Sequence, residues 1–104
     1  MLSKTRRLRA AEVREVLARG RGRGGEVLSV KILPTTSAFR CAVVVSKKLA
    51  RTAVMRNKMR RAVYRALRGT SLPHTGHAIL FVRSVPKTDA GKVFAAELKR
   101  LLHV

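Results

Sequence analysis

SKKLARTAVMRNKMRRAVYRALRG occupies residues 46–69 and carries the clearest pattern in the chain. Placed on a helix at about 100° per residue, this segment divides into two faces. One face is an apolar stripe made of Met55, Met59, Ala62, Val63 and Ala66. The other face is almost wholly cationic and comprises Asn57, Arg60, Arg61, Tyr64, Arg65 and Arg68, with Arg56 and Lys58 on its flanks. The segment therefore predicts an amphipathic helix that ends at Gly69 and packs by its apolar stripe.

The cationic face has no acidic partner within residues 46–69. A solvated helix face usually mixes both signs, whereas like charges at i,i+4, such as Arg61 and Arg65, cost about 0.2–0.5 kcal/mol per pair. A helix that accumulates such pairs is destabilised unless a polyanion neutralises them. The apolar stripe is narrow and should be consumed by packing, which leaves little surface to insert into a membrane. The helix therefore indicates contact with nucleic acid.

The whole chain shows the same imbalance of charge. Its 104 residues contain 24 Lys and Arg against 5 Asp and Glu, a formal net charge of +19, and 46% of them are hydrophobic. This composition predicts one folded domain over residues 1–104, surrounded by a field that suits a nucleic acid. The sequence shows no run of about 20 apolar residues and no apolar signal segment, and Cys41 has no disulfide partner. We therefore expect a protein of the reducing cytoplasm.

The segment before residue 27 predicts a helix and a basic loop. Residues 10–19 place Val13, Val16 and Leu17 on one stripe at helical spacing. The arginines and glycines that follow, up to Glu26, predict a flexible loop. Such a loop is either a solvated linker or a contact to phosphate.

Three segments predict β-strands, and they are residues 27–33, 38–46 and 77–83. Residues 34–37 predict a turn, so the first two strands should pair antiparallel. The second strand is apolar and β-branched enough to be central in its sheet. The chain then predicts a helix near residues 89–102, capped by Thr88 or Asp89, whose apolar stripe comprises Ala90, Phe94, Leu98 and Leu101.

The sequence predicts no catalytic residue and no metal ligand. A nuclease site needs a cluster of metal-binding carboxylates or a histidine acid and base, but the five acidic residues are scattered along the chain. His74 and His77 have no predicted partner, and together with Cys41 and His103 they lack the spacing of a zinc site. Any reaction would therefore take its chemistry from another component.

The few aromatic residues indicate that phosphate contacts dominate binding. Phe81 and Phe94 are expected in the core, Tyr64 is the best candidate for stacking on a base, and Phe39 fits either the core or a cleft wall. Arginine suits phosphate because its planar fork binds two oxygens at once. Affinity should therefore depend strongly on salt.

The stretch FRCAVVVSKK leading into TAVMRNKMRRAVYRALR resembles the protein component of bacterial ribonuclease P. The family pattern is a strand ending in Ser-Lys-Lys, a short connector, and Arg-Asn-Arg followed by one apolar and two basic residues on a helix. The matching residues are Ser46, Lys47 and Lys48, then Arg56, Asn57 and Lys58, then Met59, Arg60 and Arg61. The match is specific because it joins two short motifs across a connector.

The resemblance implies an α+β fold: a two-layer α/β sandwich of order αβββαβα, with the basic helix packed on a four-stranded sheet through a left-handed βαβ crossover. It implies a protein subunit of a ribonucleoprotein that cuts precursor tRNA endonucleolytically to give the mature 5′ end. The chemistry would be carried by a catalytic RNA, with Mg²⁺ held mainly by that RNA. The protein would be a monomer in a 1:1 complex with this RNA.

The resemblance also implies two sets of contacts. The residues expected to bind RNA are Lys47, Lys48, Arg56, Asn57, Lys58, Arg60, Arg61, Arg65 and Arg68. The residues expected to line a cleft for the 5′ leader are Val13, Leu17, Phe39 and Tyr64. The chain departs from the family at Lys58, which lacks the arginine fork, and at Tyr64, where arginine is usual. Val13 and Leu17 stand where aromatic residues are usual, which makes the expected cleft more aliphatic.

Two other functions fit the composition. A small basic ribosomal protein with a structural role in binding rRNA would have the same charge, and only the Ser-Lys-Lys and Arg-Asn-Lys pattern separates the two functions. A DNA-binding protein would insert its basic helix into a major groove. Here the arginines are spread along the whole helix, which favours a surface that follows a phosphate backbone.

Overall fold

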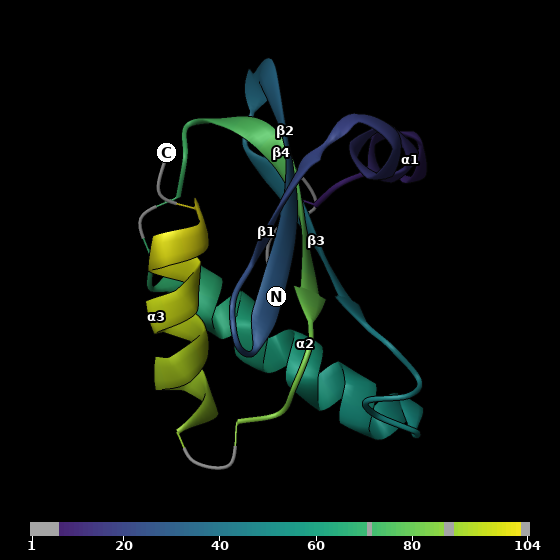
Figure 1. The fold of residues 1–104 in the computed structure, drawn as a ribbon, viewed down its shortest axis with the longest axis vertical. Helices are drawn as coiled ribbons and strands as arrows, with labels where there is room; N and C mark the ends of the chain where they lie inside the picture. Colours follow the sequence, from purple (N-terminus) through teal and green to yellow (C-terminus); the bar gives the residue numbers. More distant parts are fainter. Residues whose placement is uncertain (1–6, 71, 87–88, 103–104) are drawn as a thin grey trace.

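The computed structural model describes residues 7–70, 72–86 and 89–102 of the chain. Its elements follow the expected order αβββαβα (Figure 1). They are α1 (Ala10–Arg19), β1 (Arg21–Gly24), β2 (Leu28–Ala38), β3 (Arg40–Val45), α2 (Ala53–Arg68), β4 (Thr75–Val82) and α3 (Ala90–Leu102). The expected α+β class and all three predicted helices are confirmed.

The strands form one mixed sheet in the order β1-β2-β4-β3. β2 pairs antiparallel with β1 and β4, whereas β3 pairs parallel with β4. Two sequence predictions are therefore wrong: the strands predicted at 27–33 and 38–46 are not neighbours, and the second lies at an edge of the sheet. The cause is the return of the chain through α2, which places β4 between β2 and β3. A local pattern carries no information about such an insertion.

The turn predicted at residues 34–37 is also wrong. β2 continues through these residues to Ala38, with a shift in register against β4 between Leu33 and Ala38. Proline is tolerated where the regular ladder of hydrogen bonds is interrupted, as it is here. The chain instead leaves β2 at Phe39, whose N–H donates to the carbonyl of His74 at 3.0 Å.

The basic loop predicted after α1 contains the short strand β1. Its register with β2 runs from Arg21 opposite Ile32 to Gly24 opposite Ser29, and all four of its residues are exposed. Because this strand has no alternating apolar residues, hydrophobic periodicity could not reveal it.

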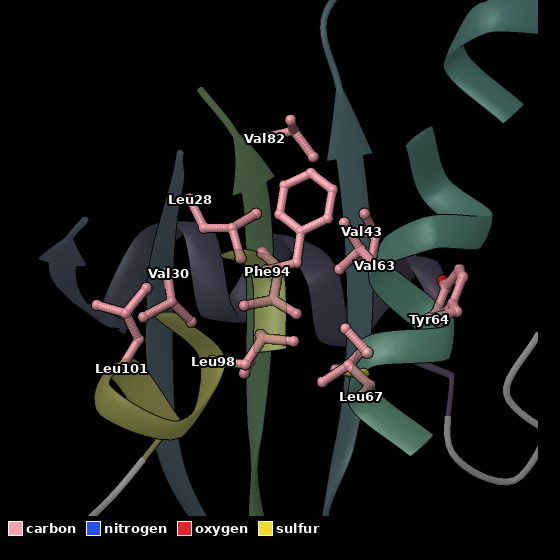
Figure 2. Packing of buried hydrophobic residues seen from close by; sticks show 14 of the residues in the cluster. Leu28, Val30, Val43, Val63, Tyr64, Leu67, Val82, Phe94, Leu98 and Leu101 are labelled. Carbon is pink, nitrogen blue, oxygen red and sulfur yellow. The ribbon is translucent and has the colours of Figure 1, made fainter. Parts of the chain in front are cut away.

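The main core lies between one face of the sheet and the helices α2 and α3 (Figure 2). Leu28 and Val30 of β2 point to this face, and Phe94, Leu98 and Leu101 of α3 are buried against it. The predicted apolar stripe of α3 is thereby confirmed. A fully buried Leu or Phe side chain contributes about 1.5–3 kcal/mol, so this layer is the main source of stability.

The starts and ends of α2 and α3 follow local rules in part. The hydroxyl of Thr52 caps α2 by accepting from the N–H of Met55 at 3.1 Å, and Gly69 follows the helix as predicted. At the start of α3, Thr88 lies outside the described residues. Asp89 has a positive φ of 46°, and its carbonyl accepts from the N–H of Val93.

α1 lies on the opposite face of the sheet and is fastened there by Glu12. Arg40 of β3 and His77 of β4 are paired neighbours and lie against this carboxylate. Arg40 Nη1 lies 3.1 Å from Glu12 Oε2, and His77 Nε2 lies 3.6 Å from the same oxygen. The N–H of Arg9 donates to Glu12 Oε1 at 2.8 Å. One carboxylate thus joins the first turn of α1 to two strands.

A second carboxylate, that of Glu97, fastens α3 to the β1–β2 connection. It accepts hydrogen bonds from the N–H groups of Glu26, Val27 and Leu28 at 3.0–3.2 Å, and the residue is buried. A Cβ at position 25 would collide with this carboxylate, which explains why Gly25 stands there. The sequence alone did not single out either carboxylate, because each has the ordinary pattern of a helix-surface residue.

We predict that Glu97→Gln lowers the free energy of unfolding by about 1.5–3 kcal/mol, the scale of hydrogen bonds to a charged group. The amide keeps one acceptor oxygen, but its NH₂ group then faces backbone N–H donors. Urea unfolding measures the change. Glu15→Gln is the matched control, since Glu15 is exposed and its ion pair among the described residues is with Arg19, at 3.4 Å. Equal stability of the two variants would contradict the role of Glu97.

We predict that Glu12→Gln flattens the acid limb of the stability curve. The hydrogen bond from Arg9, followed by the charge of Arg40, lowers the pKa of Glu12 below its ordinary 4.5, against the opposing effect of burial. A lowered pKa in the folded state adds stability above the unfolded pKa, and this stability is lost as the pH falls through the folded pKa. Unfolding at pH values from neutral down through this range should show a smaller acid loss in the variant. A parallel offset between the two curves would contradict the prediction.

Candidate nucleic-acid interface

The Ser-Lys-Lys element forms a tight turn between β3 and α2. The carbonyl of Ser46 accepts from the N–H groups of Leu49 and Ala50 at 3.2 and 3.1 Å. Ala50 is fully buried, whereas Lys47 and Lys48 are exposed. The turn therefore presents two ammonium groups beside the start of the basic helix.

Arg56 holds the connector that follows this turn. Its Nη1 donates to the carbonyls of Ala50 and Arg51 at 3.0 and 3.3 Å. This side chain is only partly exposed. The structure thus gives Arg56 a positioning contact within the chain in addition to the RNA contact expected of it.

The cationic face of α2 is accessible along the whole helix. The exposed members are Asn57, Lys58, Arg61, Arg65 and Arg68, and Arg60 is partly exposed. Among the residues that the structure describes, the ion pairs involve Glu12 and Glu15, and none of them includes a residue of α2. The charge of this face is therefore not compensated within the described part of the chain.

A small cavity lies where the chain before α1 meets α2. Arg60 Nη2 donates to Asn57 Oδ1, and these two residues line a cavity of ≈ 300 Å³ together with Arg7, Arg61 and Tyr64. Arg7 reaches the cavity because residues 7–8 run along β3: Arg7 forms a parallel bridge with Cys41, and Leu8 N–H donates to the Cys41 carbonyl at 3.1 Å. Three guanidinium groups around one cavity suit an oxyanion such as phosphate. Sequence reasoning missed Arg7 because its contact with α2 is made across the fold.

Tyr64 does not lie on the exposed cationic face, so its predicted role in stacking is wrong. It is 6% exposed and belongs to the core cluster, and it reaches only the wall of the cavity near Arg60. Its burial raises the pKa of the phenol above the ordinary 10.0. Buried Leu67 lies beside it on α2, whereas Met55 of the predicted stripe is 49% exposed. The buried residues of α2 therefore lie mainly in its C-terminal half, because the first turn makes few contacts with the core.

The four residues predicted to line the leader cleft do not come together. Phe39 and Tyr64 belong to the core between the sheet and α2 with α3. Val13 and Leu17 lie on α1, on the opposite face, where Leu17 is 45% exposed. The expectation of one cleft formed by these four residues is therefore wrong.

The face that carries α1 offers a different apolar surface. Glu12 holds the start of α1 over Arg40 and His77, and Lys31 Nζ donates to the carbonyl of Leu17 near the helix end at 2.8 Å. Ser29 lies two residues from Lys31 on β2, and Val44 lies four residues after Arg40 on β3. Both of them pair with Phe81 of β4.

This row of Ser29, Phe81 and Val44 is at least partly exposed, and Val44 is 41% exposed. The sequence analysis placed Phe81 in the core. That expectation is wrong, because Phe81 lies on the sheet face that α1 covers only in part. The row also lies next to the end of β3, where the Ser-Lys-Lys turn begins. An apolar, partly aromatic floor beside two lysines suits a nucleic-acid strand with unstacked bases.

Metal-ligand clusters and membrane-spanning helices are both absent among the described residues. Within the described ranges, no group of three or more His, Cys, Asp or Glu side chains could hold a metal ion. None of the helices in that part of the chain is long and apolar enough to span a membrane.

Comparison with known proteins gives consistent matches. The family model described as Ribonuclease P matches residues 2–104. The chain is 40% identical over 107 residues to the ribonuclease P protein component of Nocardioides sp., covering 96% of this chain and 87% of that protein. It is 43% identical over 75 residues to the component from Thermus aquaticus, covering 72% of this chain.

Two of the relatives are much longer than the region that matches this chain. The matched region spans only 44% of the Thermus aquaticus protein and 56% of the Prochlorococcus marinus protein. Among solved structures, the ribonuclease P protein from Thermotoga maritima superposes with a TM-score of 0.80 at 21% identity, covering 94% of this chain and 96% of that chain. The protein from Staphylococcus aureus superposes with a TM-score of 0.75 at 23% identity, covering 96% and 94%. These structures share the fold described above.

The family match covers nearly the whole sequence, and it agrees with the Ser-Lys-Lys turn, the Arg-Asn-Lys element and the arrangement of α2 on a mixed sheet. The chain belongs to the ribonuclease P protein component family.

Proposed function

We propose that this chain acts as the protein subunit of a ribonucleoprotein endoribonuclease that removes the 5′ leader of precursor tRNA. The observation that carries the proposal is the uncompensated cationic face of α2, which the family motif also occupies. A row of like charges on one helix is unfavourable in the protein alone and becomes favourable when phosphates neutralise it. Family membership does not favour the alternative of a structural ribosomal protein.

The catalytic RNA is the proposed partner of α2 and the Ser-Lys-Lys turn. Lys58, Arg61, Arg65 and Arg68 are exposed and able to follow a phosphate backbone, since they lie along one helix without an acidic neighbour. Arg60 and Asn57 are joined by a hydrogen bond, and both line the cavity that Arg7 also lines. This cavity would hold a single phosphate. These contacts recognise charge and shape and leave base sequence unread.

The 5′ leader is the proposed ligand of the open sheet face. Phe81 supplies a partly exposed ring, Val44 an exposed aliphatic surface, and Lys47 and Lys48 a nearby positive charge. A leader is single-stranded, so its bases can contact such a floor while its phosphates face lysines. α1 forms one wall of this surface because Glu12 and Lys31 hold its two ends.

The chemistry is proposed to reside in the RNA. Mg²⁺ would be held mainly by RNA phosphates, and this chain would bind, orient and shield the RNA. We further propose that the protein acts in the cytoplasm as a monomer in a 1:1 complex. The strength of such a complex should come from phosphate contacts, whose contribution falls as salt rises.

We predict that the purified protein increases cleavage of precursor tRNA by the catalytic RNA of the same organism at low magnesium concentration. Protein cations would replace part of the magnesium that screens RNA repulsion. Cleavage is followed with a 5′-labelled precursor. Unlabelled precursor tRNA that carries the leader should compete with the labelled precursor better than the same tRNA without a leader does. The reason is that only the leader contacts the open sheet face. No increase in cleavage would overturn the proposal.

We predict that Arg61→Gln with Arg65→Gln weakens binding to the catalytic RNA and makes the salt dependence shallower. The slope of log K against log salt should fall in magnitude by about 1.4–1.8, since each lost phosphate contact contributes about 0.7–0.9. Filter binding over a salt series measures it. Arg61→Lys with Arg65→Lys keeps the charge and should retain most of the slope. A full slope in the glutamine variant would exclude these residues from the interface.

A further inference from the structure

Arg56 lies one helical turn inside α2 and reaches back to the connector before the helix, residues 49–52. Side chains on a helix lean toward its N-terminus, and Arg56 comes one turn after Thr52, the N-cap. Its Nη1 therefore donates to the carbonyls of Ala50 and Arg51, at 3.0 and 3.3 Å. Both carbonyls precede the N-cap, whose own carbonyl is the first in a helix to accept a hydrogen bond. Arg56 thus binds two carbonyls that the backbone of α2 does not bind.

The contact with the connector leaves Arg56 less able than its neighbours to bind phosphate. Arginine owes its affinity for phosphate to a planar fork of N–H donors. In Arg56, the Nη1 end of this fork already donates to two carbonyls, and the side chain is only partly exposed. Arg61 and Arg65 of the same helix are exposed. The structure therefore separates Arg56 from the arginines that are open to a polyanion.

The start of α2 depends on such polar contacts because the core does not hold it. Val54 is 66% exposed and Met55 is 49% exposed, and the first buried residue of α2 is Met59. Figure 1 shows the start of α2 and the connector on the side of the molecule away from α3. The cap hydrogen bond of Thr52 and the contacts of Arg56 therefore join the connector to the helix where packing is sparse.

The Ser-Lys-Lys turn is fixed at both of its ends. At the first end, the carbonyl of Ser46 accepts from the N–H of Ala50 at 3.1 Å. At the second end, Ala50 is fully buried, and its carbonyl accepts from Arg56. Lys47 and Lys48 lie between these points and are exposed. A group whose backbone is ordered before binding loses less conformational freedom when it binds, so this arrangement favours contact of the two lysines with a partner.

We propose that Arg56 is a positioning residue for RNA binding, and that it acts by holding Lys47 and Lys48 beside α2. The partner is a phosphodiester chain that contacts these two lysines and the exposed arginines of α2 together. Loss of Arg56 would free the turn to move relative to the helix, and the two lysines would then contact phosphate less often. The inference rests on the proposed function for the choice of RNA, and it differs from the expectation that Arg56 itself binds RNA.

The test is a double-mutant cycle on binding to the catalytic RNA of the same organism at a fixed salt concentration. Arg56→Gln removes the guanidinium group and should lower affinity about tenfold, the scale of a hydrogen bond from a charged group. Lys47→Gln with Lys48→Gln, the lysine variant, removes the two ammonium groups. Arg56→Gln added to the lysine variant should lower affinity by less than about threefold, because the lysines that Arg56 positions are already absent.

Arg61→Gln is the matched control, because it removes the same charge from an exposed residue of α2. It should lower affinity by the same factor with and without the lysine substitutions, since Arg61 contacts a phosphate of its own. Amide hydrogen exchange of the free protein gives a readout without RNA: the N–H groups of Leu49 and Ala50 should exchange faster in Arg56→Gln than in Arg61→Gln. Urea unfolding should show every variant folded under the binding conditions, because all substituted side chains lie outside the core cluster.

An equal loss of affinity on Arg56→Gln with and without the lysines would overturn the inference, because Arg56 would then contact RNA itself. Full affinity in Arg56→Gln or in the lysine variant, or unchanged exchange at Ala50, would overturn it as well. If Arg61→Gln still weakens binding in those cases, only this inference fails. If Arg61→Gln and the lysine variant both bind as the unsubstituted protein does, the proposed function fails with it.

Discussion

The structure depends on how α2 divides its surface between an apolar side that packs in the core and a cationic side that stays exposed. α2 buries Met59, Val63 and Leu67 against the sheet and α3, and it leaves its cations outside. Burial of such side chains contributes about 1.5–3 kcal/mol each, which exceeds the few tenths of a kcal/mol lost per like-charged pair. The core can therefore hold the helix in place without partners for its charges. The proposed RNA contact would use that surplus of charge.

The scarce carboxylates reinforce this division. Glu12 joins α1 to Arg40 and to His77, and Glu97 binds the amides of the β1–β2 connection. Both acids thus act within the fold, on elements other than α2. Had either carboxylate faced α2, it would have stabilised the free protein at the expense of affinity for phosphate. The two carboxylates thus stabilise the fold at places away from α2, where their charge would not compete with the proposed phosphate ligand.

Part of this architecture follows from the sequence alone. α2 and α3 have long apolar stripes at helical spacing, and their boundaries depend on local signals such as Gly69. The order of the strands does not, because β4 reaches its place between β2 and β3 only after the chain has passed through α2. β1 escaped detection for a related reason: an exposed edge strand of arginine and glycine has no apolar periodicity. Its strand geometry depends on pairing with β2.

The site shows the same limit at the level of single residues. A helical wheel assigns Tyr64 to the cationic side, yet the real contact surface of α2 is set by where β3 and the chain at Arg7 lie. The buried side of α2 therefore includes Tyr64, and Phe81, on the other face of the sheet, has a partly exposed ring. The two proposed contacts depend on different interactions: α2 would attract phosphate by long-range charge, whereas Phe81 and Val44 would contact bases only at short range. A single-stranded leader bound on the second face would be held near the helix surface proposed for the catalytic RNA, because β3 leads from one to the other. The sheet thus relates the two proposed RNA contacts to each other in a way that neither helix nor strand could achieve alone.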